Sequence, residues 1–174
     1  MKSILFLMIA IVIITGSAFA QSTKAEKKAL KEAKLNAKFK KALAAIDAKD
    51  FVIVVDSYRS NHDGGQYITI DRTNFFSYEK QFAYAQGAIF FGESYPDCHK
   101  LDVSDFSKEV DKKGNVTVKM FVRGNLIEAK VEISLKKGDN NADVNFRMRN
   151  IELRYTGEVV PAAESNYFKR VVKV

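Results

Sequence analysis

The side chains with catalytic chemistry are few, and their spacing does not favour catalysis. Cys98 and His99 are adjacent, and a Cys–His nucleophile pair requires the imidazole within hydrogen-bond reach of the sulfur. Neighbouring residues on a strand point to opposite faces, so their adjacency argues against such a pair. We interpret Cys98 as a loop or strand-edge thiol that is not a nucleophile. The second histidine, His62, lies far away in a polar turn, and this spacing predicts no metal site.

Residues 139–143 begin like a calcium-binding loop but do not continue as one. The sixth position of such a loop needs glycine and holds Val144, and the twelfth needs glutamate and holds Asn150. We therefore expect a turn at these residues.

A further segment holds four carboxylates: Asp102, Asp105, Glu109 and Asp111. Glycoside hydrolysis requires two carboxylates at a fixed separation across a sugar-sized cleft, whereas acids alternating on an exposed strand are far commoner. The sequence contains no phosphate-binding loop, nucleophile elbow or dinucleotide-binding fingerprint. It therefore predicts no catalytic residue, no metal ligand and no bound cofactor.

Aromatic residues gather in one segment, residues 75–95, which holds eight of the 20 phenylalanines and tyrosines. Core packing is the ordinary explanation for such residues. The segment lacks a clean alternation, however, and an exposed aromatic loop would be a binding surface. The candidate residues for a ligand or partner surface are Tyr78, Tyr84, Phe90, Phe91 and Tyr95.

The N-terminus predicts export. Lys2 is followed by an apolar run over residues 4–14, and Ala18-Phe19-Ala20 has the small residues of a signal-peptidase site. We predict that residues 1–20 are a cleaved signal peptide, because the run is short for a membrane span. No cysteine stands at the cleavage site, so we expect a soluble periplasmic or extracellular protein and not a lipoprotein.

The net charge of +7 is concentrated in one segment. Residues 21–50 hold nine lysines and four acids, whereas residues 51–174 hold 18 basic and 17 acidic residues. Residues 21–50 are rich in Ala, Lys, Leu and Glu, and they begin with a capping box formed by Thr23 and Glu26, which predicts a helix. Its apolar stripe consists of Leu35, Phe39, Ala42, Leu43 and Ile46.

The lysines of this helix have two interpretations. A solvated helix face is favoured, because the first turns carry few large apolar residues. The alternative is a weak electrostatic contact with an anionic envelope surface through residues 21–50. Export and the lack of a basic stripe with interleaved aromatics argue against nucleic acid as a partner.

From residue 51 the hydrophobic pattern alternates with a period of two, which indicates antiparallel strands. The clearest hairpin joins residues 116–123 to residues 127–135 through Gly124-Asn125, and a third strand follows at residues 144–149. We expect a bulge or turn at Asn150 and a less regular strand over residues 101–111. The prediction is a mainly β (α+β) fold. In it the helix precedes an antiparallel meander, residues 51–160, that forms a curled sheet, small barrel or sandwich, and a tail follows at residues 161–174.

The order of these features resembles a family of secreted Bacteroidetes proteins known as domain of unknown function 4251. The resemblance rests on the N-terminal signal, the Lys/Ala helix that runs into Phe51-Val52, and three later segments. These segments are residues 82–91 (FAYAQGAIFF), 141–151 (NADVNFRMRNI) and 155–159 (YTGEV). The resemblance implies export and a β-rich fold, and it brings no activity or site residues with it.

Three functions remain at this point. The first is a non-enzymatic exported module that binds a protein or a small molecule through the aromatic segment or an open end of the sheet. The second is an envelope-associated structural protein tethered by its basic helix. A hydrolase of envelope polymers ranks last, because no nucleophile and base are paired.

Overall fold

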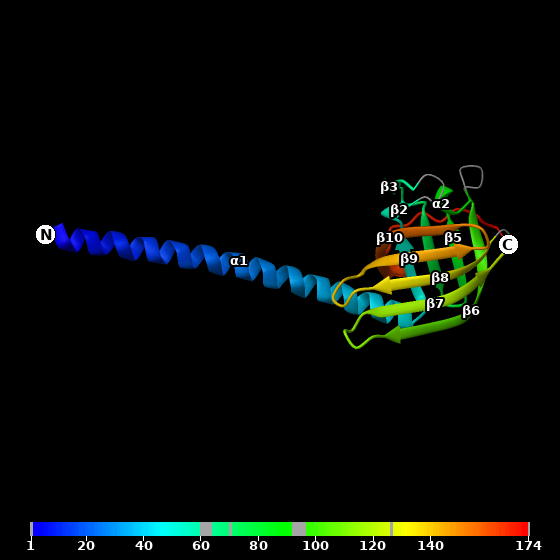
Figure 1. Cartoon of the computed structure of the whole chain (residues 1–174), viewed down its shortest axis with the longest axis horizontal. Helices are drawn as coiled ribbons and strands as arrows, with labels where there is room; N and C mark the ends of the chain where they lie inside the picture. Colours follow the sequence, from blue (N-terminus) through cyan, green and yellow to red (C-terminus); the bar gives the residue numbers. More distant parts are fainter. Residues whose placement is uncertain (1, 60–63, 70, 92–96, 126, 174) are drawn as a thin grey trace. The chain divides into compact units, whose positions relative to one another are not determined.

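Figure 1 shows the protein as a computed structural model, which describes residues 2–59, 64–69, 71–91, 97–125 and 127–173. The chain divides into two compact units, Met1–Ala37 and Lys38–Val174. In chain order, the elements are α1 (Lys2–Asp47), β1 (Asp50–Val54), β2 (Ser57–Arg59), β3 (Gln66–Ile68), β4 (Phe75–Glu79), β5 (Phe82–Gln86), α2 (Ala88–Phe91), β6 (Cys98–Val110), β7 (Val116–Arg123), β8 (Glu128–Leu135), β9 (Asn141–Met148), β10 (Glu152–Pro161), the short 3-10 helix η1 (Ala162–Glu164) and β11 (Val172–Lys173).

Helix α1 begins much earlier than the sequence predicts. The predicted start was the capping box at Thr23, whereas the helix runs without interruption from Lys2 to Asp47. The N-terminal residues include no proline, which would end a helix, so the helix continues through the predicted cap. The side chains of residues 23–34 are all exposed, and Phe39 and Ile46 of the predicted stripe are buried. Among the described residues, no helix is long and apolar enough to cross a membrane.

Eight antiparallel strands form a closed barrel. The order around it is β1, β4, β5, β6, β7, β8, β9, β10 and back to β1. This confirms the predicted mainly β fold and selects the barrel among the three predicted architectures. Figure 1 shows β6 to β10 side by side in chain order, as their hairpin pairing requires. The register of β6 shifts between Ser104 and Ser107, which is the irregularity expected in this strand.

Strand β10 closes the barrel by sharing one edge between two partners. Its residues 154–156 pair with β2, and its residues 159–161 pair with β1. Gly157 lies at the transition, where an added Cβ would stand 2.1 Å from the carbonyl oxygen of Val54. No side chain fits at that distance, so glycine allows the two backbones to approach closely enough for closure.

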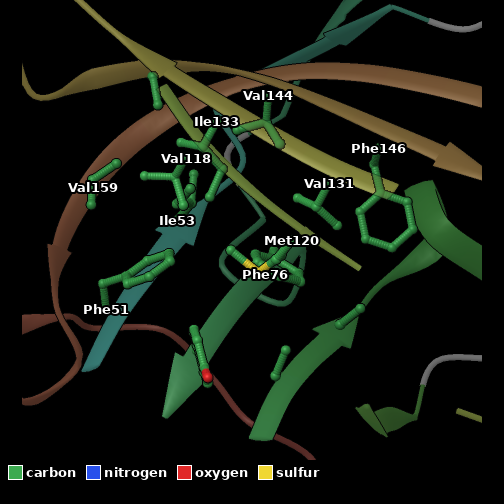
Figure 2. Close-up of a cluster of buried hydrophobic side chains, with 14 of the residues drawn as sticks. Phe51, Ile53, Phe76, Val118, Met120, Val131, Ile133, Val144, Phe146 and Val159 are labelled. Atoms are coloured by element: carbon green, nitrogen blue, oxygen red, sulfur yellow. The ribbon is translucent and has the colours of Figure 1, made fainter. Parts of the chain in front are cut away.

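Apolar side chains fill the interior of the barrel. Figure 2 shows many of them meeting in one cluster, and the labelled residues are Phe51, Ile53, Phe76, Val118, Met120, Val131, Ile133, Val144, Phe146 and Val159. Phe39 and Ile46 near the end of α1 belong to the same cluster. Phe90 also belongs to this cluster; it lies on α2, which follows β5 in the chain, and its ring centroid is 5.2 Å from that of Phe146. An eight-stranded barrel is just wide enough for side chains, and this one uses that space for its core.

Part of the outer surface of the barrel is also apolar, and the C-terminal tail covers it. Val52, Phe75 and Cys98 alternate with inward-facing residues, yet they are fully buried. Residues 165–173, which we call the C-terminal strap, lie against them: Tyr167 packs on Phe75, and β11 pairs in parallel with the start of β6. The regular elements of this tail are the 3-10 helix η1, just before the strap, and the two-residue strand β11 within it.

Gln86 attaches the strap to the barrel. Its side chain is fully buried; Nε2 donates hydrogen bonds to the carbonyl oxygens of Phe168 (2.7 Å) and Thr73 (3.1 Å). Its Oε1 accepts a hydrogen bond from the backbone N–H of Arg170 (2.7 Å). Glu79 adds a second attachment, because it receives hydrogen bonds from Tyr167 (3.0 Å) and Lys169 (2.8 Å).

Replacing Gln86 should release the strap and uncover Cys98. Gln86→Ala leaves backbone groups of the strap unpaired, so we expect the free energy of unfolding to fall by about 1–3 kcal/mol. Cys98 is the single cysteine, and burial raises its pKa to about 12. Its alkylation rate in native buffer should therefore rise clearly above that of the unmodified protein. Gln66→Ala, which truncates an exposed glutamine on β3, is the control. A thiol that reacts equally slowly in both variants would contradict the proposed attachment.

Candidate functional site

The structure does not assemble the predicted aromatic surface. Tyr78 (5% exposed) packs against Phe51 inside the barrel, with ring centroids 6.2 Å apart, and Phe90 is 7% exposed in the core. Both are core residues, because alternation in β4 and the short helix α2 direct them inward. Tyr84 is half-buried on the outer face, where Lys169 Nζ lies 3.3 Å from its ring centroid. The side chain of Phe91 and the whole of Tyr95 lie outside the described residues.

Cys98 and His99 point to opposite sides of β6. Cys98 belongs to the cluster beneath the strap, and the next residue of the strand faces the interior. The thiol lies within the sheet, between Gln86 of β5 and Val172 of β11, so the expectation of a loop or edge position was wrong. Burial is the main cause of its raised pKa, which keeps the sulfur protonated and unreactive at neutral pH.

One residue from each predicted acidic segment, Asp111 and Asp139, closes a turn. Asp111 accepts hydrogen bonds from the backbone N–H (2.9 Å) and side-chain Nδ2 (2.8 Å) of Asn115, which lower its pKa and close the β6–β7 turn. Asp139 accepts a hydrogen bond from the backbone N–H of Asn141 (3.0 Å), as a turn requires. Among the described residues, no three His, Cys, Asp or Glu side chains gather as a metal site. His62 lies outside the described part of the chain.

The outer face of strands β7 to β10 and β2 differs from the strap-covered face, because most of its side chains are polar and its surface is hollowed. A groove of about 410 Å³ lies over β2, β8, β9 and β10. We call it the polar groove, and its outward-facing polar lining consists of Ser57, Arg59, Gln66, Glu132, Ser134, Asp143, Asn145, Arg154 and Thr156. A second groove of about 280 Å³ over β6 to β9 shares Glu132 and Asn145 with it.

The register of the strands arranges these side chains in two parallel rows. A charged row crosses five strands and consists of Lys119, Glu132, Asn145, Arg154 and Arg59. A hydroxyl row lies two residues further along each strand and consists of Thr117, Ser134, Asp143, Thr156 and Ser57. Facing residues on adjacent strands are about 5 Å apart, so each row is a continuous band of donors and acceptors. Within the hydroxyl row, Ser57 Oγ and Thr156 Oγ1 are hydrogen-bonded at 2.9 Å.

Glu152, at the start of β10, fixes the neighbouring polar groups. Its Oε1 accepts hydrogen bonds from Asn145 Nδ2 (2.6 Å), Arg147 Nη2 (3.2 Å) and Arg154 Nη2 (3.0 Å). These three bonds stabilise the carboxylate and lower the pKa of Glu152 to about 2. The two arginines are thus held in defined orientations while about 60% of each side chain stays exposed.

The structure also brings together two carboxylates that the sequence did not single out. Asp56 and Glu158 line a separate groove of about 390 Å³ beside Arg72. Burial, and then the charge of Glu158, raise the pKa of Asp56. Glu158 is itself ion-paired with Lys38 Nζ at 2.8 Å, so this pair connects the end of α1 to β10.

Comparisons with known proteins place the barrel in a structural family. The model of a family described as a domain of unknown function, DUF4251, matches residues 33–159. The crystal structure of a DUF4251 family protein from Bacteroides eggerthii DSM 20697 is similar, with a TM-score of 0.64 and 25% sequence identity over 78% of this chain and 95% of that chain. No curated protein sequence matches significantly. The groove residues lie within the matched range, and the C-terminal strap lies beyond it.

The lowered pKa of Glu152 predicts a specific acid sensitivity. Because the pKa falls from its ordinary value of 4.5 to about 2 on folding, the carboxylate stabilises the protein above pH 4.5. That contribution should disappear as the pH falls from 4.5 to 2. Glu152→Gln should therefore lower the melting temperature at pH 7 and lessen its decline over this acid range. Glu128→Gln, which removes an exposed carboxylate that contacts Arg123, is the control. Identical pH profiles for Glu152→Gln and the wild type would contradict the assignment.

Proposed function

This chain belongs to the DUF4251 family, and we propose that it is an exported, non-catalytic binding module that holds its ligand outside the barrel, in the polar groove. The observation that carries the proposal is the pair of polar rows lining a groove on an otherwise filled barrel. An eight-stranded barrel can hold one small ligand in its lumen, and here apolar side chains occupy that space. A ligand therefore has access to the outer surface of the barrel and not to its lumen.

The composition of the groove supports binding more than catalysis. Its side chains are hydrogen-bond donors and acceptors held on rigid strands, which is the arrangement that fixes a ligand's orientation. The chain's strongest nucleophile, the Cys98 thiol, is buried under the strap on another face. The low pKa of Glu152 keeps it ionised as a hydrogen-bond acceptor and makes it a poor general acid at neutral pH.

Export is supported by the N-terminal residues and by the capping box. Removal of residues 1–20 would leave Thr23 close to the new N-terminus. There the Thr23 hydroxyl and the Glu26 carboxylate can accept hydrogen bonds from backbone N–H groups, which have no partner in the first turn of a helix. The sequence thus contains a helix start at the place where the mature chain would need one, although the full-length helix does not use it.

Export can be tested by the mass of the protein recovered from the cell envelope and medium. We expect the mature chain to begin at Gln21, because Ala18 and Ala20 flank the cleavage bond as small residues. Ala20→Arg should abolish cleavage and leave all 174 residues in place. Ala25→Arg, which places the same side chain beyond the site, is the control. Recovery of uncleaved wild-type protein in the cytoplasm would contradict export.

The groove can be tested by filling it. Ser134 lies on its floor in the hydroxyl row, and Ser134→Trp should occupy the groove without entering the core. Asn36→Trp places the same side chain on the exposed surface of α1, at a residue that lines neither groove. The mature protein is tested for binding to immobilised polygalacturonate, dextran and polyglutamate. We expect at least one polymer to bind the wild type and Asn36→Trp, and binding to fall at least tenfold in Ser134→Trp, because tryptophan excludes the ligand. Failure of all three to bind, or equal binding by Ser134→Trp, would contradict the proposal.

A further inference from the structure

Two arginines face each other across the edge of the polar groove. Arg59 of β2 and Arg154 of β10 are direct partners in the antiparallel ladder, and both line the groove. Side chains at such positions are about 5 Å apart at Cβ, and like charges there destabilise the sheet. Among the ion pairs formed by the described residues, none includes Arg59. The two guanidinium groups thus place two positive charges close together, and a bound anion would reduce the repulsion between them.

One of the two guanidinium groups is already oriented. Arg154 donates from Nε (3.3 Å) and Nη2 (3.0 Å) to Glu152 Oε1, which leaves its other N–H groups available to a ligand. A planar guanidinium with free N–H groups matches the two oxygens of a carboxylate, and a fixed orientation reduces the entropy lost on binding.

The rest of the groove excludes a ligand that is anionic throughout. Glu132 lies in the charged row two strands from Arg154, and Asp143 lies in the hydroxyl row beside Ser134 and Thr156. These carboxylates would repel a uniform polyanion and would instead accept hydrogen bonds from neutral hydroxyl groups. The groove therefore favours a ligand in which carboxylates alternate with hydroxyls.

The hollowed surface is also longer than one small molecule. The polar groove and the groove over β6 to β9 meet at Glu132 and Asn145, so the depression continues across neighbouring strands. Phe121 and Lys130 line the second groove, and they provide an aromatic ring and another cation along the same path. An extended chain fits such a surface better than a compact molecule.

We propose that the polar groove binds an acidic polysaccharide, with Arg59 and Arg154 holding a sugar carboxylate and with Glu132, Ser134 and Asp143 accepting hydrogen bonds from adjacent hydroxyls. This inference rests on the proposed function and names the ligand class of the same groove. Uronic acid units carry the carboxylate and the hydroxyls on one ring, which matches the two rows.

The test compares polygalacturonate with dextran, polyglutamate and polyphosphate, each titrated at the same ionic strength into the mature protein. Polygalacturonate should bind most tightly, and Arg59→Gln should weaken it about tenfold, which is the loss expected for one charge-assisted contact. Lys112→Gln removes the same charge from the exposed β6–β7 turn and should leave the affinity unchanged. Circular dichroism of each variant confirms that the barrel is folded.

The possible failures of the two proposals are distinguishable. Dextran that binds the wild type, is lost in Ser134→Trp and is retained in Arg59→Gln would leave the binding groove standing and overturn the acidic ligand. Polyphosphate or polyglutamate binding as tightly as polygalacturonate, or equal weakening by Lys112→Gln, would show general electrostatic attraction and would also overturn it. Absence of binding by all four polymers would overturn both proposals.

Discussion

The pairing of β10 with β1 closes the sheet, and the positions of both outer faces depend on it. Closure joins segments more than 100 residues apart in the chain, and it requires the backbone of β10 to pass within contact distance of Val54 at Gly157. Once the sheet is closed, eight strands leave a lumen that side chains can fill, and Phe51, Phe76 and Phe146 fill it. The core that stabilises the barrel is therefore the same feature that moves any binding site to the outside. A larger barrel would have room for a ligand cavity in its interior, whereas the interior of this one holds only its core.

The two outer faces of the barrel differ in how they are shielded from water. On β1, β4, β5 and β6 the outward residues include Val52 and Phe75, and the chain covers them with its own C-terminal strap. On β7 to β10 most outward residues are charged, hydroxylated or amides, so this face can stay in contact with water. Gln86 makes the first arrangement stable, because it pairs with backbone groups of a tail that has little regular structure of its own. The face that stays open to solvent is thus the one that presents polar groups.

The sequence predicted the strands where one face is apolar and the other polar, and failed where that contrast is missing. Residues 116–149 alternate cleanly because only their inner face is covered, so their hairpins were predictable. Residues 75–86 have apolar residues on both faces because the strap covers the outer one. The resulting irregular pattern left core packing and an exposed binding surface both open, and the structure places Tyr78 and Phe90 in the core. Closure and the strap arise from pairings between distant segments, which local periodicity does not report. The groove was missed for the same reason, since Arg59 and Arg154 become neighbours only through the register of β2 with β10.

The distribution of arginine and lysine connects the charge pattern to the site. The seven arginines all follow residue 58, whereas ten of the 21 lysines precede residue 50. Lysine is a flexible point charge suited to a solvated helix, and the exposed residues 23–34 use it in that way. Arginine offers a rigid fork, and Arg147 and Arg154 sit on strands where Glu152 orients both. The net charge of the segment after residue 50 is close to neutral, so its recognition chemistry follows from the placement of individual groups. A carboxylate held between Arg59 and Arg154 would restore on binding the charge balance that the sheet itself lacks at this ladder position.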